Sequence, residues 1–391
     1  MSDAAHLLVL NAGSSSIKVQ LFEDERSILR GQIDGLGTDP HFTLHDAEGA
    51  VLADRALSPS EGACHDSALT VIVDWMRRER PDVRAAAIGH RVVHGGPQFG
   101  DPVLIDDAVL ETLAGLIPLA PLHQPHNLSG IRAARAAFPG RPQVACFDTA
   151  FHRGHPRVVD TFALPGHFYD EGVRRYGFHG LSYEYIAGRL AEIAPERAQG
   201  RVVVAHLGNG ASMCALSGGR SVSSTMGFSA LDGLPMGTRS GQIDPGVLLY
   251  LMQEKGMDGD AIADLLYHRS GLKGLSGVSS DMRALEASDA PEAALAIDHF
   301  VLRIRREVGA LTALLGGLDA LVFTGGIGEH SATVRAKVCA DMGWLGIALD
   351  ASANADHALR LSPEGAAVAV YCIATDEERM IARHTRRLIA T

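Results

Sequence analysis

The chain contains the same pattern twice: a short apolar strand, a turn rich in Gly, Ser or Asn, and a second strand. The first copy covers residues 6–22 and the second covers residues 202–216. Apolar runs of this length with such turns between them are typical of β-hairpins. Because the copies lie about one domain length apart, we expect a duplicated domain in which each copy opens with a hairpin. Two unrelated hairpins are the alternative on this pattern alone.

A third Gly-rich segment follows a helix and a strand. Apolar residues spaced three to four apart predict a core-facing helix over residues 297–315, and a Gly pair ends it. Residues 319–324 predict a buried strand and residues 325–330 another Gly-rich turn. The last helix is expected to begin near residues 375–378, which have a capping-box pattern. Buried strands that lead into Gly-rich turns indicate an α/β protein.

Composition narrows the classes of function. The chain has 391 residues, of which 46% are hydrophobic, so it can build more than one buried core. Lys and Arg total 35 against 46 Asp and Glu, a net charge of -11 that disfavours nucleic-acid binding by bulk electrostatics. Five cysteines without a CxxC pair are expected as reduced thiols in a cytoplasmic protein. The uncharged stretch 112–131 contains three prolines, so we expect a helix end and a buried loop, not a membrane span.

The three Gly-rich turns favour phosphate binding. Backbone N–H groups in a tight turn form an anion site, and Gly lets a phosphate approach the main chain. None of the turns matches the GxxxxGK[ST] pattern of a P-loop, and none is the GxGxxG fingerprint of dinucleotide binding. Lys18 follows the first turn on the same strand face as Ser16, from which it can reach back to a phosphate. A solvated strand lysine is the alternative.

Two arginines stand in uncharged, Gly-rich surroundings. Arg91 follows the apolar run 85–88, and Arg239 lies within residues 236–241. Guanidinium groups bind carboxylates and phosphates in a fork geometry. In an extended segment Val93 shares a face with Arg91, which suits a short-chain carboxylate. The alternative, surface arginines on loops, is less favoured because so few charges surround them.

Other polar residues are candidates for a metal or a catalytic carboxylate. Asp148 follows the apolar run 144–147, at the end of a predicted strand. Glu377 lies in the first turn of the last helix, where capping or stabilisation of the helix dipole is the alternative. His90 and His94 are four residues apart, which on a strand is about a dozen ångströms, so a zinc site is disfavoured.

Nine segments resemble, in order, the motifs of the acetokinase family, which comprises acetate kinases and related short-chain acyl kinases. The resemblance as a whole extends from residue 7 to about residue 385. The segments are 11–18 (NAGSSSIK), 90–96 (HRVVHGG), 147–152 (FDTAFH), 176–180 (YGFHG), 206–210 (HLGNG), 236–241 (MGTRSG), 280–283 (SDMR), 323–329 (FTGGIGE) and 375–378 (TDEE). One such motif is weak evidence, but nine in order are specific.

The resemblance implies reversible, direct in-line phosphoryl transfer between Mg-ATP and acetate, with acetyl phosphate and ADP as products. It implies an α/β fold of two ribonuclease H-like domains, as in the acetate and sugar kinase/heat-shock ATPase/actin superfamily. The expected domains are residues 1–149 with 378–391, and residues 150–377, which would bind the nucleotide and form the interface of a homodimer. Mg²⁺ is the implied metal, with Mn²⁺ as a substitute. Neither a nucleic acid nor a membrane is an expected partner.

The resemblance also assigns individual residues. Its catalytic positions are Arg91, Asp148, His179 and Arg239, and its magnesium positions are Asn11 and Glu377. The acyl substrate is expected at Arg91, Val93, Leu122, Phe178 and Ala230. ATP is expected at Ser14, Ser16, Lys18, His206, Leu207, Gly208, Asn209, Gly210, Asp281, Met282, Arg283, Gly326, Ile327, Gly328, Glu329 and His330.

Phosphoryl transfer depends mainly on positioning and charge neutralisation, which explains this choice of residues. Arg91 and Arg239 would hold the acyl carboxylate and the moving phosphoryl group. His179 would donate a hydrogen bond to the equatorial oxygens of that group. We expect Asp148 to organise magnesium and its waters; proton transfer is the alternative, disfavoured because a carboxylate nucleophile is already deprotonated near neutral pH.

The chain departs from the family pattern at several positions. Leu181 and Tyr183 stand where the pattern has Thr and a second His, and Ala230 stands where it has Pro. A smaller pocket wall at Ala230 would admit a longer acid, and each methylene in an apolar pocket is worth about 1–3 kcal/mol. A propionate or other short-chain acyl kinase is therefore the alternative. An actin- or chaperone-like ATPase is the alternative from another class, but such a protein has no need of an arginine pair beside His179.

Overall fold

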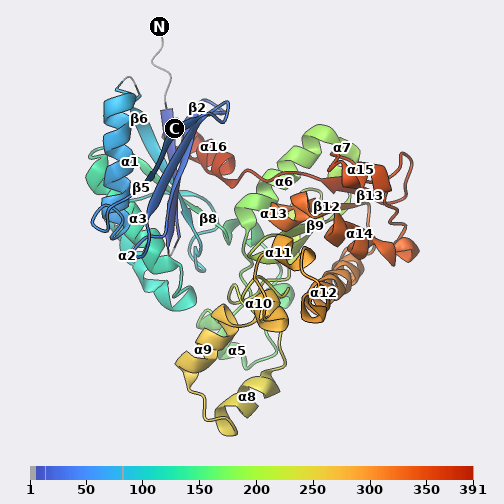
Figure 1. The fold of residues 1–391 in the computed structure, drawn as a ribbon. Coiled ribbons are helices and arrows are strands. Elements are labelled where there is room, and N and C mark those ends of the chain that lie inside the picture. The colour runs from blue at the N-terminus through green and yellow to red at the C-terminus, as the bar shows by residue number, and fades with distance from the viewer. Residues whose placement is uncertain (1–5, 14, 82, 391) are drawn as a thin grey trace. The chain divides into compact units, whose positions relative to one another are not determined.

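The computed structural model describes residues 6–13, 15–81 and 83–390, which form two compact units (Figure 1). The first unit combines the two ends of the chain, Met1–Phe151 and Asp376–Thr391. The second unit is His152–Thr375. Each unit has its own β-sheet with helices packed against it.

The first unit carries the following elements. Its strands are β1 (His6–Ala12), β2 (Ser16–Glu23), β3 (Arg26–Asp34), β4 (His41–Asp46), β5 (Val51–Ala56), β6 (Ala85–Val92), β7 (Val103–Leu104) and β8 (Gln143–Phe147). Its helices are α1 (His65–Glu79), α2 (Asp107–Gly115), the 3-10 turn η1 (Ile117–Leu119), α3 (Gln124–Ala137) and α16 (Glu377–Ile389). The 3-10 turn η2 (Ala150–His152) joins the two units in sequence.

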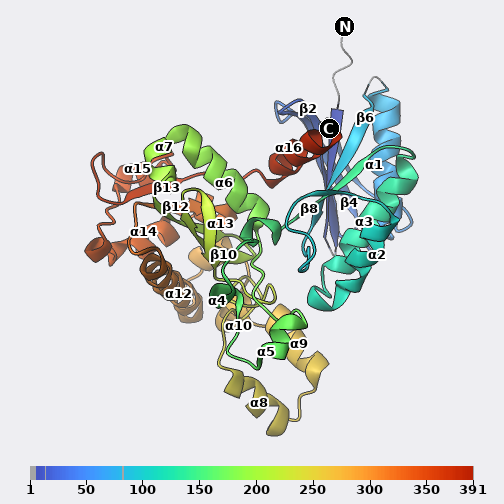
Figure 2. The same cartoon turned by 180° about the vertical axis from the view of Figure 1, so that it is seen from behind.

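The sheet of the first unit has the order β5-β4-β3-β2-β1-β6-β8-β7. Strands β1, β2 and β3 are antiparallel neighbours, whereas β6 pairs parallel to β1 and β8 parallel to β6. Helices α1 and α3 cover one face and α16 covers the other (Figures 1 and 2). The packing is close enough that a Cβ on Gly130 of α3 would lie 2.7 Å from the Ala12 side chain, and one on Gly89 of β6 would lie 2.6 Å from Ile381 of α16.

The second unit carries its own set of elements. Its strands are β9 (Arg201–Leu207), β10 (Ala211–Ser217), β11 (Arg220–Ser224), β12 (Ala320–Thr324) and β13 (Ala369–Cys372). Its helices are α4 (Arg157–Asp160), α5 (Gly166–Asp170), α6 (Gly180–Ile193), α7 (Pro195–Ala198), α8 (Pro245–Gln253), α9 (Gly259–His268), α10 (Gly271–Ser276), α11 (Met282–Glu286), α12 (Pro291–Leu315), α13 (Gly325–His330), α14 (Ala332–Ala340), the 3-10 turn η3 (Gly343–Leu345) and α15 (Ala351–Ala355).

The sheet of the second unit repeats the centre of the first. Its order is β11-β10-β9-β12-β13, with an antiparallel β9–β10–β11 meander and with β12 and β13 parallel to β9. The equivalent strands of the first unit are β3-β2-β1-β6-β8, in the same order and the same directions. The topology therefore agrees with the duplicated domain that the repeat predicts. Helix α12 packs against β9 and β10, and α6 packs against β9.

Two local predictions differ from the structure. The predicted turn over residues 325–330 is the helix α13, which follows β12 directly because Gly325 adopts a positive φ of 77°. The loop predicted within residues 112–131 is shorter than expected, since α3 already begins at Gln124 with Pro125 in its first turn. Among the residues that the structure describes, no helix is long and apolar enough to cross a membrane.

Candidate active site

Polar residues gather at one edge of the first sheet. Asn11 lies near the end of β1, Arg91 near the end of β6, and Asp148 directly after β8. These three strands are parallel neighbours or share a partner, so their carboxyl ends meet at the same edge. Glu377, the first residue of α16, reaches the same group: its Oε2 lies 3.7 Å from Arg91 Nε.

The strongest interaction at this edge is the pair of Arg91 and Asp148. Arg91 donates from Nε to Asp148 Oδ1 over 3.0 Å and from Nη2 to Oδ2 over 2.7 Å, a two-point fork. Burial alone would lower the pKa of Arg91, but the charges of Asp148 and Glu377 outweigh it and hold the pKa above its ordinary value. The guanidinium is therefore a fixed cation. Asp148 takes two of its five N–H bonds, which leaves three that can bind an anion.

Glu377 carries the oxygen chemistry that a magnesium ion requires. Burial raises the pKa of Glu377, with Arg91 opposing the shift and Asp148 adding to it. Burial also raises the pKa of Glu378. These desolvated carboxyl groups favour a nearby divalent cation, and the side-chain amide of Asn11 offers the same kind of hard oxygen donor. Because Mg²⁺ commonly takes one or two protein ligands together with substrate phosphates and water, Asn11 and Glu377 fit the metal.

Two further residues hold the edge together, and the sequence analysis did not single them out. Asn127 of α3 is buried and donates from Nδ2 to Ala12 O over 2.9 Å, while its Oδ1 accepts from Val93 N over 2.9 Å. His65 of α1 contacts Gly13 O through Nε2 at 2.8 Å. Asn127 thus fixes the end of β1 relative to the segment that follows Arg91. The only signal in the sequence was a polar residue in a largely apolar, uncharged stretch.

The first hairpin places its expected phosphate ligands beside Asn11. Lys18 pairs with Asn11 across the β1–β2 ladder, and its side chain is exposed. Ser16 is partly buried and accepts at its backbone carbonyl from Gly13 N over 2.8 Å. The expected ligand Ser14 lies outside the described residues.

The second unit forms the equivalent hairpin between β9 and β10. Its turn closes with a hydrogen bond from Gly208 N to Gly210 O over 3.1 Å. The turn is attached to the Arg239 segment, because Gly237 N donates to Asn209 O over 3.0 Å. A Cβ on Gly237 would lie 2.0 Å from Asn209 Oδ1, so a larger residue there would displace the Asn209 side chain.

His179 and Arg239 meet above Gly210. An ideal Cβ built on Gly210 would lie 3.3 Å from His179 Nε2 and 3.5 Å from Arg239 Nη2. An imidazole nitrogen and a guanidinium N–H group therefore face one small space beside the hairpin turn. The guanidinium is anchored at its other end, where Nη1 donates to Ala230 O over 2.9 Å. This arrangement can hold an anion such as a phosphoryl group.

A cavity of about 630 Å³ lies next to this hairpin in the second unit. Its volume is in the range of small-molecule and cofactor sites. It is lined by Gly208, Asn209, Ser280, Asp281, Met282, Arg283, Glu286, Gly326, Ile327, His330 and Ser331. Eight of these residues are expected ATP ligands. Ser280, Glu286 and Ser331 were not expected; Ser331 Oγ donates to Glu286 Oε1 over 2.5 Å.

Other expected ATP ligands do not line this cavity. Leu207 is fully buried, Gly328 is buried, and His206 bonds to Ser182 Oγ through Nδ1 at 2.8 Å. Glu329 turns away to the backbone, where its Oε1 accepts from Gly325 N over 2.8 Å and from Thr375 N over 3.1 Å. Glu329 therefore stabilises the start of α13 and connects it to Thr375. Its motif did not indicate this role.

The expected acyl-binding residues belong to different units. Val93 and Leu122 are partly buried in the first unit, whereas Phe178 is buried and Ala230 partly buried in the second. The acyl pocket therefore stays a prediction. Phe178 is held by its carbonyl, which contacts His152 Nε2 at 2.9 Å.

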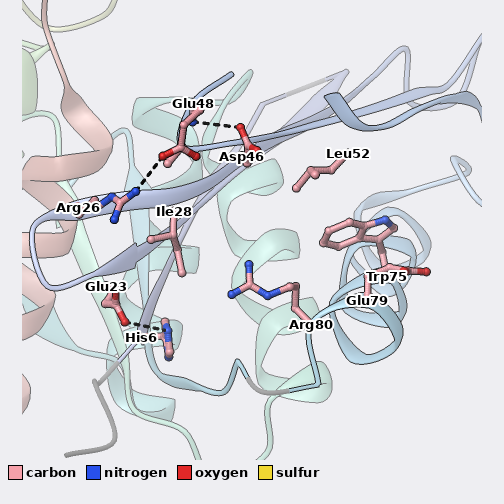
Figure 3. A pocket seen from close by; sticks show the side chains of 11 residues that line it. His6, Glu23, Arg26, Ile28, Asp46, Glu48, Leu52, Trp75, Glu79 and Arg80 are labelled. Carbon is pink, nitrogen blue, oxygen red and sulfur yellow. Dashed lines mark hydrogen bonds and ion pairs between the residues drawn. The ribbon is translucent and has the colours of Figure 1, made fainter. Parts of the chain in front are cut away.

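Another hollow, of about 780 Å³, lies in the first unit between α1 and the sheet (Figure 3). Two pairs of its charged side chains contact each other: Arg26 Nη2 lies 2.9 Å from Glu48 Oε1, and His6 Nε2 lies 3.9 Å from Glu23 Oε1. None of the expected site residues lines it.

The fold defines a class of protein built from two ribonuclease H-like units, and comparison with known proteins gives the family. Residues 6–383 match the acetokinase family. The chain belongs to this family. A relative from Nitrobacter hamburgensis named acetate kinase is 56% identical over 388 residues, which is 98% of this chain and 96% of that protein.

Solved structures agree with this assignment. The crystal structure of Porphyromonas gingivalis acetate kinase superimposes with a TM-score of 0.89 at 38% identity and covers 99% of this chain and 100% of that one. A propionate kinase from Francisella tularensis superimposes with a TM-score of 0.91 at 36% identity, covering 98% and 99%. Both likenesses extend over the whole chain, so the alternative of an actin- or chaperone-like ATPase is set aside.

Proposed function

We propose that this protein is an acetate kinase that transfers the terminal phosphoryl group of ATP to acetate and catalyses the reverse reaction. The observation that carries the proposal is the approach of His179 Nε2 and Arg239 Nη2 to one space beside the Gly208–Gly210 turn. That turn borders the cavity proposed for ATP. The names of the relatives support the same activity.

Each proposed catalytic group has a separate task. Arg91 binds the carboxylate of the acid through the N–H bonds that Asp148 does not take. Arg239 and His179 donate to the transferred phosphoryl group, where negative charge lies in the transition state. Because carboxylates hold Arg91 and a backbone carbonyl holds Arg239, neither guanidinium has to reorganise during the reaction.

Magnesium is the proposed metal, held by Asn11 and Glu377. When bound it neutralises charge on the phosphate oxygens. Among the described residues no group of three or more His, Cys, Asp and Glu is arranged to hold a metal, so a site completed by substrate phosphates and water suits the chain. Asp148 is proposed to orient Arg91 and to accept hydrogen bonds from metal-bound water.

The proposal is tested by a hydroxamate assay with acetate, propionate and butyrate and Mg-ATP. Acetyl phosphate formation is expected, and no product from any of the acids would overturn the proposed function. Arg239→Ala should lower kcat by roughly a thousandfold, since a phosphoryl-binding arginine is worth about 10³–10⁵. Arg269→Ala is the matched control, because Arg269 is exposed and pairs only with Asp264 among the contacts described for it.

Propionate is the alternative substrate, for which the Francisella tularensis relative gives a precedent. Position 230 supports it, because the Ala230 carbonyl anchors Arg239 while the small side chain leaves room for an additional methylene. A kcat/KM for propionate close to that for acetate would support this alternative, and a negligible value would contradict it.

A homodimer is proposed with α8 at its interface. This helix buries none of its residues within the chain, and Leu249, Tyr250 and Met252 are each about half exposed. Figure 1 shows α8 at the end of the second unit away from its sheet. A second copy of the chain would cover this apolar surface. Leu249→Glu should then shift the mass measured by light scattering from dimer to monomer, and a dimer that persists would contradict the proposal.

A cytoplasmic location is proposed as well. All five cysteines are free, as expected for a reducing compartment, and the cytoplasm supplies ATP and Mg²⁺.

A further inference from the structure

Two buried hydroxyl groups stand behind His179 in the second unit. The Tyr183 hydroxyl lies 2.5 Å from Ser212 Oγ, and the same oxygen lies 2.8 Å from His179 Nδ1. Tyr183 and Ser212 are both fully buried. The three groups therefore form one continuous relay from α6 through β10 to the imidazole. The proposed reaction uses only the other ring nitrogen, Nε2, so it assigns no task to either hydroxyl.

The direction of each hydrogen bond in this relay follows from the number of protons that each group carries. Ser212 carries one hydroxyl proton, so it donates to one neighbour and accepts from the other. A phenol is a much stronger acid than an alkyl hydroxyl, with a pKa near 10, and is therefore the better donor. Tyr183 then donates to Ser212, and Ser212 donates to His179 Nδ1. A neutral imidazole that accepts at Nδ1 carries its proton at Nε2.

We propose that Tyr183 and Ser212 are positioning residues that keep neutral His179 in the tautomer with its proton on Nε2. His179 then donates to the transferred phosphoryl group without first having to become an imidazolium. The opposite tautomer would present a lone pair at Nε2 to an anion, which is repulsive. The identity of that anion rests on the proposed function, whereas the tautomer itself does not.

The charged and titratable groups around the relay explain why a neutral donor is favoured. Arg239 Nη2 approaches the same space as His179 Nε2, and His206 stacks on His179 with ring centroids 4.3 Å apart. A positive charge on His179 is disfavoured by the neighbouring guanidinium. His152 faces the Tyr183 ring edge-on at 5.6 Å, and burial lowers the pKa of His152 to about 3, so it stays neutral.

The backbone of His179 has an unusual conformation at the start of α6. His179 is not a glycine but has a φ of 57°, in the left-handed region that non-glycine residues rarely adopt. It is the residue before α6, and Tyr183 N donates to His179 O over 3.0 Å. The first turn of α6 therefore places Tyr183 directly behind His179.

The tautomer can be observed without turnover. Protein labelled with ¹⁵N-histidine gives two-bond ¹H–¹⁵N spectra in which protonated and unprotonated ring nitrogens have distinct shifts. The His179 signals are identified by their loss in His179→Gln. In the wild-type chain at pH 8, Nδ1 should be unprotonated and Nε2 protonated, and a proton on Nδ1 would overturn the proposal. Tyr183→Phe should allow the Nδ1-protonated form to appear.

Kinetics give the second readout. Tyr183→Phe frees Ser212 to accept from Nδ1, so kcat should fall by about tenfold or more at pH 8, given that one preorganised donor is worth about 10²–10³. The deficit should appear in kcat and not in the KM for acetate, because His179 is proposed to donate to the transferred phosphoryl group and not to the acid. Tyr185→Phe on the same helix is the matched control and should match the wild type in kcat and in KM.

The two readouts separate this inference from the proposed function. A deficit in Tyr183→Phe that leaves the His179 tautomer unchanged in the spectrum, or that lies in KM and not in kcat, would indicate a merely structural role and overturn the inference, even with acetate kinase activity intact. If no acid is phosphorylated but the wild-type spectrum shows the Nε2 proton and Tyr183→Phe loses it, the proposed function fails while the relay is supported.

Discussion

Gly210→Ala should abolish phosphoryl transfer while leaving the fold intact. The added methyl carbon would lie 3.3 Å from His179 Nε2 and 3.5 Å from Arg239 Nη2. A phosphoryl oxygen that bonds to these donors must lie about 2.7–3.1 Å from each, in the same space. The methyl group and the oxygen cannot both occupy it. Since one donor of this kind is worth about 10²–10³ in rate, losing two should lower kcat by roughly 10³ or more.

The same contacts indicate that the variant folds. No atom lies within 3.0 Å of the added carbon, and Gly210 is not among the glycines with positive φ. Replacing such a glycine commonly stabilises a protein by about 0.4–1 kcal/mol. Gly210 does not line the cavity proposed for ATP, so the Kd of ATP measured by titration calorimetry should change little. Gly309→Ala, with open space around it, is the control. A kcat within tenfold of the wild type would refute the reasoning.

Three other substitutions test separate parts of the structure. Asp148→Asn weakens the hold on Arg91 and should raise the Mg²⁺ concentration for half-maximal activity; an unchanged requirement with only a shifted pH–rate profile would favour proton transfer. The Arg201 guanidinium lowers the pKa of Asp319 to about 2, so its stabilisation is present above the unfolded pKa of about 3.9 and is lost as pH falls towards 2. Asp319→Asn should lower the Tm by about 2–4 °C at pH 7 and by about half as much at pH 3, as calorimetry can measure. Ala230→Pro should lower kcat/KM for propionate relative to acetate by about tenfold; an unchanged ratio would exclude position 230 as a wall.

Because the chain contains the same strand–turn–strand pattern twice, the architecture could be predicted from the sequence. Both predicted hairpins exist, and the predicted strand 319–324 agrees with β12, the parallel neighbour of β9. Apolar periodicity and turn residues act over a few neighbours, so a single sequence is sufficient to read them. The predicted turn at residues 325–330 failed because Gly325 alone provides the reversal, and the residues after it are free to form a helix.

The residues that fix the positions of the site's side chains were harder to predict than the residues that are proposed to bind substrate or metal. Asn127 connects Ala12 to Val93 through bonds that span 115 and 34 positions of the sequence. Glu329 was assigned to ATP from its motif, but its carboxylate bonds to Thr375 N, 46 positions away. Contacts of this kind depend on the tertiary arrangement, and no local pattern reports them.

Each of the three proposed anion donors is fixed in position by a hydrogen bond to another residue. Arg91 is held by Asp148, Arg239 by the Ala230 carbonyl, and His179 by Ser212, each through a group from another segment of the chain. A donor fixed in this way needs no reorganisation when charge develops on the substrate, whereas a flexible side chain would have to be ordered at that moment. The holding groups are therefore expected to act on kcat more than on substrate affinity. Substitutions behind the donors should accordingly slow the reaction while ATP still binds.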